Sequence, residues 1–202
     1  MSIFGSFMGI MLIGLLVLAA VVFFMIITYN KLITYRNRYE NAFKQIDVQL
    51  TRRYELIPNL VEVAKGYMKH EKETLEAVIN ARNQAFSAGQ AVGQNPGDPA
   101  AIKNLAAAEQ NLGGALGRLL MVAESYPDLK ANQNMMALQE ELTSTENKLA
   151  YARQGFNDAV TQFNINRDQF PANVVAGLFG FNRAELLEME DPKARVAPKV
   201  SF

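Results

Sequence analysis

No charged side chain occurs before Lys31, and apolar residues dominate the chain up to that point. From Met8 to Ile27 the sequence reads MGIMLIGLLVLAAVVFFMII, a run of 20 residues interrupted only by two glycines. In a helix such a run rises about 30 Å, the hydrocarbon thickness of a bilayer. A cleaved signal peptide would need a basic leader, a shorter apolar run and a cleavage site, none of which fits this stretch. The pattern predicts an uncleaved transmembrane helix over residues 8–28, preceded by a short extracytoplasmic N-terminus, residues 1–7.

Beyond Lys31 apolar residues recur at three- and four-residue spacing, and no alternating run typical of a strand is found. Pro58 removes a helix donor and restricts Ile57, so we expect the first soluble helix to end or kink there. Asp98 followed by Pro99 is a strong helix start. A sustained heptad pattern marks the last long helix. The predicted helices cover residues 29–56, 58–91, 99–125 and 129–169.

Long helices with short connections favour an up-down-up-down bundle. The predicted fold class is therefore all-α. A transmembrane helix continues into an elongated antiparallel four-helix bundle, residues 29–169. A short apolar C-terminal helical segment, residues 170–190, and a flexible tail, residues 191–202, follow it.

Four charged residues fall on the apolar stripes of the predicted helices: Arg53, Glu71, Arg82 and Glu109. Arg53 has no acid three or four residues away on its own helix, so a partner on another helix is expected. We interpret the four residues as a structural ion-pair layer that sets helix register, or as charges that reach the rim of the bundle. A catalytic or proton-handling cluster is the alternative.

The amino-acid composition argues against several classes of function. Lys and Arg number 20, as do Asp and Glu, which argues against a nucleic-acid-binding protein. The chain has no cysteine and a single histidine, His70. His70 and Glu71 begin an H-E-x-x-H pattern, but position 74 is Thr, so a zinc-protease helix is excluded. We expect no catalytic residue, no metal site and no cofactor.

Two segments are candidate interaction surfaces. Gly113, Gly114 and Gly117 give a thin helix face, which would pack closely either within the bundle or against another copy. The stretch FPANVVAGLFGF contains Phe170, Leu178, Phe179 and Phe181. It would either cap the open end of the bundle or lie in the membrane interface as an apolar wedge.

Together these motifs resemble the LemA family. The resemblance rests on the N-terminal anchor, on the stretches from Tyr29 to Arg82 and from Tyr126 to Asn164, and on FPANVVAGLFGF. Where that family usually has Tyr-Asn pairs late in the fourth helix, this chain has Phe156-Asn157 and Phe163-Asn164. The resemblance implies a bacterial protein with one N-terminal span and a cytoplasmic helical domain, and it implies no catalytic residues.

Our first functional hypothesis is a non-enzymatic, membrane-anchored scaffold that forms homo-oligomers, including large ones. The second is an adaptor or regulator of another membrane protein, such as a membrane protease or an envelope-stress component. The expected partners are the lipid bilayer, further copies of the chain and another membrane protein, with no nucleic acid. Basic residues follow the span and none precede it, so the bundle is expected on the cytoplasmic side of the bacterial inner membrane.

Overall fold

The computed structural model describes residues 2–188, with side chains from residue 8 onward, and within this range the protein is all-α. The predicted fold class is confirmed. The predicted flexible tail, residues 191–202, lies outside the described residues. The helices are α1 (Ser2–Tyr67), α2 (Lys72–Gln94), α3 (Pro99–Ala123), α4 (Pro127–Lys130), α5 (Gln133–Asp168) and α6 (Ala172–Leu178).

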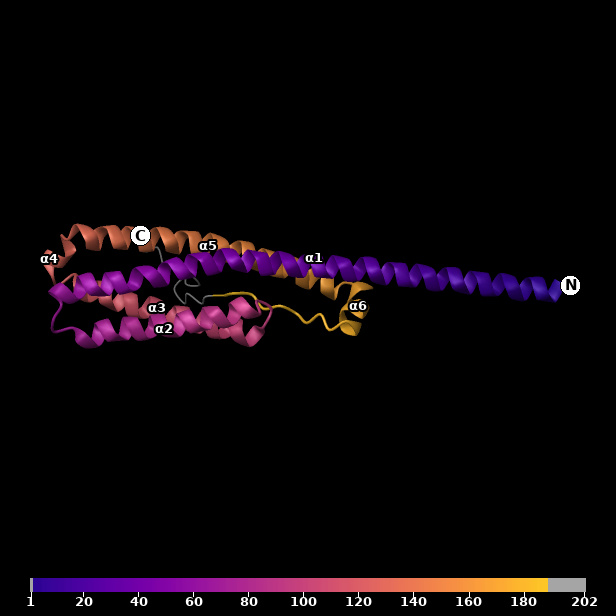
Figure 1. Ribbon diagram of the computed structural model, residues 1–202, viewed down its shortest axis with the longest axis horizontal. Helices are drawn as coiled ribbons and strands as arrows, with labels where there is room; N and C mark the ends of the chain where they lie inside the picture. The colour runs from indigo at the N-terminus through magenta and orange to yellow at the C-terminus, as the bar shows by residue number, and fades with distance from the viewer. Residues whose placement is uncertain (1, 189–202) are drawn as a thin grey trace, which may run out of the picture.

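Helix α1 organises the molecule. Its 66 residues correspond to a rod about 100 Å long, and its N-terminal part projects beyond the bundle (Figure 1). It packs against α5 and α2, and α2 packs against α3, so consecutive long helices run antiparallel. Most of the apolar stripe predicted for the first soluble helix is buried: Leu32, Tyr39, Phe43, Ile46, Leu50 and Ile57 are each at most 4 % exposed, while Tyr35 is half-buried.

The predicted end of this helix at Pro58 is wrong, because α1 continues through the proline to Tyr67. The second long helix accordingly begins at Lys72 and not at Pro58. A proline inside a helix leaves the carbonyl four residues earlier without its usual N–H partner. That carbonyl belongs to Tyr54, and another helix supplies its donor, as described below.

The predicted fourth helix, 129–169, is divided into α4 and α5. Asn132 explains the division, because its side-chain oxygen accepts a hydrogen bond from the Met135 N–H at 3.0 Å and caps α5. Asp98 caps α3 in the same way, through the Ala100 N–H at 2.9 Å, and Pro99 follows it as predicted.

The C-terminal segment, predicted as helical over 170–190, is only briefly helical. Helix α6 ends in a Schellman motif, in which the Phe181 N–H donates to the Ala176 carbonyl at 2.9 Å. Gly180 takes the left-handed conformation that this motif requires, with φ of 69°. Residues 181–188, named here the strap, then leave the helix and run back along the bundle (Figure 1).

Candidate functional site

Of the four residues of the predicted ion-pair layer, Arg53 and Glu109, at the centre of the bundle, are the only two that form an ion pair with each other among the described residues. Arg53 Nη1 lies 2.6 Å from Glu109 Oε2, and the two side chains are 7 % and 3 % exposed. Glu146, which is partly exposed, adds a second carboxylate 3.2 Å from the same guanidinium nitrogen. The pair links α1 to α3, as expected for an arginine without an acid on its own helix.

Tyr54 completes this centre. Its hydroxyl lies within hydrogen-bond distance of Glu109 Oε1 and of the Ala85 carbonyl, so it joins α1, α2 and α3. Burial raises the pKa of Glu109, although Arg53 and the Tyr54 hydroxyl act in the opposite direction. Burial, followed by the charge of Glu109, raises the pKa of Tyr54. These groups bind one another and are almost closed to solvent, which is the arrangement of a structural centre.

Arg82 does not belong to an ion-pair layer. Its Nε donates to the Tyr54 carbonyl at 3.0 Å, and this is the carbonyl that Pro58 leaves without a helical donor. Its guanidinium also lies 5.1 Å from the ring centre of Phe86 and 3.1 Å from the Asn83 side-chain oxygen. The role predicted for Arg82 is therefore corrected: it replaces a backbone donor that the proline removes.

Glu71 also lies apart from the centre. It precedes α2, and its carboxylate accepts a hydrogen bond from the Tyr126 hydroxyl at 3.3 Å. Neither Glu71 nor Arg82 forms an ion pair within 4.0 Å among the described residues. The predicted layer of four residues is thus wrong as a unit, and only Arg53 and Glu109 come together.

The three glycines of α3 face outward. Gly113, Gly114 and Gly117 are exposed, and a Cβ atom added at any of them would meet nothing within 4 Å. The prediction that these glycines pack closely inside the bundle is therefore wrong. The other alternative, packing of these glycines against a second copy of the chain, stays a prediction, and the surface that it requires is open in the single chain.

The membrane-proximal apolar residues divide into two groups. Phe170, Leu178 and Phe179 are 83 %, 69 % and 56 % exposed, whereas Phe181 is 5 % exposed and packs in the core. The ring of Phe181 lies 5.5 Å from that of Tyr29, and the ring of Phe179 lies 4.9 Å from it. Phe181 therefore belongs to the cap of the bundle, and the other three form an outer apolar face.

Two asparagines that the sequence interpretation left without a role hold the strap. Asn164 donates to the Ala184 carbonyl at 2.9 Å and accepts from the Ala184 N–H at 3.0 Å. Asn157, seven residues earlier on α5, makes the same pair of bonds with Leu187, at 3.3 and 2.8 Å. The only sequence signal was the repeated Phe-Asn pair, whose phenylalanines are buried in the core.

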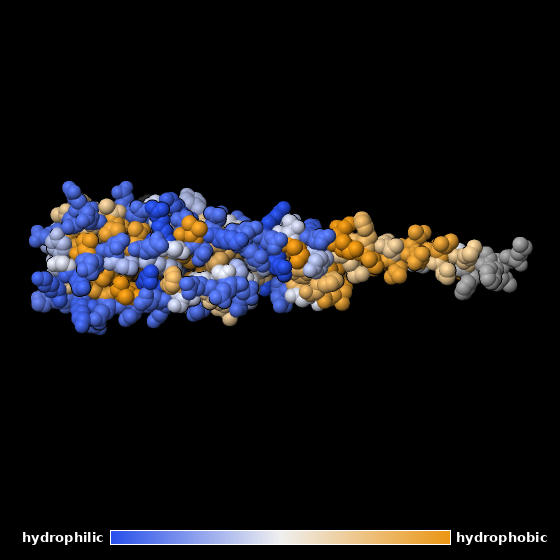
Figure 2. All heavy atoms as spheres, viewed as in Figure 1, coloured by the Kyte–Doolittle hydropathy of each residue, from blue (hydrophilic) through white to orange (hydrophobic). Residues whose placement is uncertain are grey.

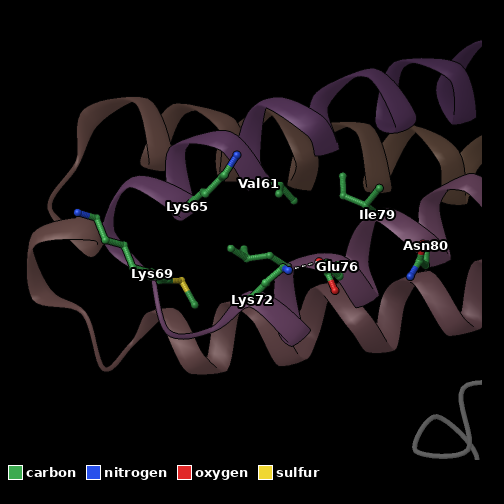
Figure 3. Close-up of a pocket in the computed structure, with 9 residues that line it drawn as sticks. Val61, Lys65, Lys69, Lys72, Glu76, Ile79 and Asn80 are labelled. Atoms are coloured by element: carbon green, nitrogen blue, oxygen red, sulfur yellow. Dashed lines mark ion pairs between the residues drawn. The ribbon is translucent and has the colours of Figure 1, made fainter.

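Sequence reasoning also missed a groove of about 790 Å³ between the end of α1 and the start of α2, at the end of the bundle away from α6. We name it the distal groove. Figure 3 shows Lys65, Lys69 and Lys72 around it, with Lys72 paired to Glu76 at 3.5 Å. Its floor comprises Val61, Met68, Leu75 and Ile79. It combines an apolar floor with a basic rim, and Glu71, Arg82 and Glu109 are not among its lining residues.

In the part of the chain that the structure describes, no three His, Asp or Glu side chains gather as potential metal ligands. One helix, α1, is long and apolar enough to cross a membrane, judged by length and composition.

Comparisons with known proteins identify relatives over most of the chain. The model of the LemA family matches residues 42–202. Magnetosome proteins MamQ 1 and MamQ 2 of Paramagnetospirillum magneticum are each 26 % identical over 199 residues, covering 91 % of this chain and 73 % of the relative. Magnetosome protein MamQ of Magnetospirillum gryphiswaldense is 25 % identical over 188 residues, covering 86 % of this chain and 69 % of the relative.

Proposed function

The chain belongs to the LemA family, and from this premise we propose that it is a non-enzymatic, membrane-anchored scaffold. In this proposal the bundles associate laterally into homo-oligomers, including large ones, at the bacterial cytoplasmic membrane. The anchor is the N-terminal part of α1, where the most apolar window is 0 % buried by the rest of the protein. A helix surface that is apolar on all sides suits a helix surrounded by lipid.

The orientation follows from the charges beside the anchor. Lys31, Arg36 and Arg38 come directly after it, and no Lys or Arg precedes it. Basic residues next to a span remain on the cytoplasmic side. The bundle would therefore stand on the inner face of the membrane, as a direct continuation of the spanning helix.

The observation that carries self-association is the open face of α3. A Cβ atom added at Gly114 or Gly117 would have nothing within 4 Å, and Met121, one turn further, is 71 % exposed. Small residues on a helix surface allow the backbone of a second helix to approach closely. A face of this kind on the outside of a long bundle supports lateral packing of one rod on another.

The relatives are named magnetosome proteins, and the alignments extend over most of this chain, including much of the bundle. For this chain we propose the more general role of organising or shaping the envelope membrane.

The test is a size measurement on matched glycine variants. Gly114→Leu adds a side chain to open space, so the single bundle is expected to fold, and the helix gains about 1 kcal/mol in propensity. If α3 is the contact face, the full-length variant in mild detergent forms smaller particles than the wild type. Gly155→Leu on α5 is the control, because that glycine is equally open. Loss of oligomers in both variants, or in neither, contradicts the assignment of the face.

A second function, the adaptor, is favoured by the distal groove. An apolar floor with three lysines around it fits an amphipathic helix that carries acidic residues beside its apolar face. Lys69 is the most informative position, because among the described residues it has no ion-pair partner. Under this function Lys69→Glu abolishes the cross-link to a specific membrane protein in cells, whereas Lys148→Glu on α5 retains it. A monomer or dimer in detergent is expected in that case.

A further inference from the structure

Helix α6 covers α1 at the end of the predicted transmembrane segment. Thr28, the last residue of that segment, is 6 % exposed, and Met25 packs partly against the core. The next residue, Tyr29, stacks edge-on against Phe179 with ring centres 4.9 Å apart. These contacts fix the level of α6 along α1 to within about one helical turn.

This level coincides with the membrane surface if residues 8–28 span the bilayer, a condition that rests on the proposed function. The segment rises about 31 Å as a helix, so the chain leaves the hydrocarbon core of the bilayer at residue 28. Tyr29 then lies at the boundary between acyl chains and headgroups, where tyrosine is enriched. Because Phe179 contacts Tyr29, it must lie at the same depth.

The side of α6 that faces away from the bundle is apolar. Val174 and Leu178 lie one turn apart and are 54 % and 69 % exposed, while Val175 and Ala176 on the inner side are 2 % and 1 % exposed. Phe170 and Phe179 extend the outer side at 83 % and 56 % exposed. Figure 2 shows hydrophobic surface where α6 lies, joined to the hydrophobic surface of the projecting part of α1.

Two basic side chains contact Phe181, which is buried next to this apolar face, and each also pairs with an acid: Arg36 with Glu40 and Arg167 with Asp168. The Arg36 guanidinium is 5.7 Å from the ring centre of Phe181, and the Arg167 Nε donates to the Phe181 carbonyl at 3.0 Å. Lys31 lies 5.9 Å from the ring centre of Tyr35, on the bundle side of Tyr29. An apolar surface with cations on its bundle side matches the order of acyl chains and phosphate groups in a membrane leaflet.

We propose that Phe170, Val174, Leu178 and Phe179 form a second membrane-contact site that is inserted in the interface of the leaflet adjoining the bundle. The occupant of this face is lipid, because the face is continuous with the spanning helix and lies at its exit. If the spanning helix were the only membrane contact, the bundle would be free to rotate about the axis of that helix. The second contact fixes which side of the rod faces the membrane, so neighbouring rods present their α3 faces in a defined direction.

The absence of tryptophan from the chain permits a direct test. Phe170→Trp and Phe179→Trp each introduce a single indole at an exposed position in the full-length protein. The variants are reconstituted in phosphatidylcholine–phosphatidylglycerol vesicles whose acyl chains are brominated near the headgroup in one series and near the chain ends, at the level of residue 18, in a second series, and indole emission is recorded. Leu18→Trp inside the span is the positive control. Tyr151→Trp, at a position 77 % exposed on the bundle, is the negative control.

The proposal expects emission from positions 170 and 179 to be quenched by the brominated lipid and blue-shifted, several-fold more than emission from position 151. If position 18 is quenched but 170 and 179 behave like 151, the second contact is overturned and the anchor stands. If position 18 is not quenched either, both the anchor and the second contact fail. Blue-shifted emission at 170 and 179 that is unquenched and varies with the protein-to-lipid ratio assigns this face to another copy and also overturns the proposal.

Discussion

The compensation of Pro58 by Arg82 leads to a quantitative prediction. In the wild type the Tyr54 carbonyl belongs to a residue that is 2 % exposed, and it accepts from Arg82 Nε because Pro58 has no N–H. Arg82→Met keeps the apolar stem but removes the donor. A buried carbonyl left without a partner costs about 1–3 kcal/mol, so we expect the variant to lose about 2 kcal/mol of unfolding free energy.

The same substitution has a smaller effect when the helix supplies its own donor. In Pro58→Ala the restored N–H reaches the Tyr54 carbonyl, and Arg82 is no longer its only donor. In that background we expect Arg82→Met to cost about 1 kcal/mol or less, which gives a coupling free energy of about 1–2 kcal/mol between positions 58 and 82.

The measurement is thermal unfolding of the full-length protein in detergent, followed by circular dichroism at 222 nm for the four members of the cycle. For a chain of this size, 1 kcal/mol corresponds to a shift of about 2–4 °C in Tm. Arg52→Met is the matched control. Its partner Glu141 is partly exposed, so the loss should be below about 1 kcal/mol and independent of residue 58. Equal losses for Arg82→Met in both backgrounds would refute the compensation.

Three further predictions concern the buried centre and the strap. Arg53→Met leaves Glu109 buried without its cation and should cost about 3 kcal/mol in unfolding free energy. The double variant Arg53→Met with Glu109→Leu should cost clearly less, and thermal unfolding measures both. Burial raises the pKa of Glu109 above 4.5, so the folded state binds this proton more tightly than the unfolded state. The contribution of Glu109 to the unfolding free energy is complete below pH 4.5 and is lost as the pH rises through the pKa of the folded state. Glutamine does not titrate, so over this pH range the Tm of Glu109→Gln should rise relative to that of the wild type. Asn164→Ala removes both hydrogen bonds to Ala184 and should speed proteolytic cleavage within residues 181–188, while Asn166→Ala, whose side chain donates to Gln162 on its own helix, should not.

Each of these predictions has a contradicting outcome. If the double variant at positions 53 and 109 is as unstable as Arg53→Met alone, the loss does not come from an unpaired carboxylate. A stability difference between wild type and Glu109→Gln that is constant or of opposite slope across the titration would show that burial does not raise this pKa. Equal cleavage of the strap in the wild type and in Asn164→Ala would mean that other contacts hold it.

Much of the fold could be predicted from the spacing of apolar residues. A stripe such as Leu32, Tyr39, Phe43 and Ile46 can be read locally, because a helix places every third or fourth residue on one face. The Arg53 prediction also followed from local reasoning, since an arginine on that stripe without a nearby acid requires a partner from another helix. Glu109 is that partner.

The wrong predictions concern positions whose conformation depends on a residue far away in the sequence. Pro58 breaks helices when its lost donor is not replaced, and the replacement comes from Arg82, 24 residues later in the chain. The strap escaped prediction because Asn157 and Asn164 bind its backbone, which has no side-chain signature. The distal groove depends on how α1 and α2 meet at their turn, and spacing along the chain carries no information on that geometry.

The most direct test of the central claim is the particle mass and shape of the purified full-length protein in mild detergent, by mass photometry and negative-stain imaging. The scaffold account predicts discrete particles much larger than one 22.4 kDa chain, with rods packed side by side. Particles of monomer or dimer mass across a wide concentration range would contradict it and would favour the adaptor function through the distal groove.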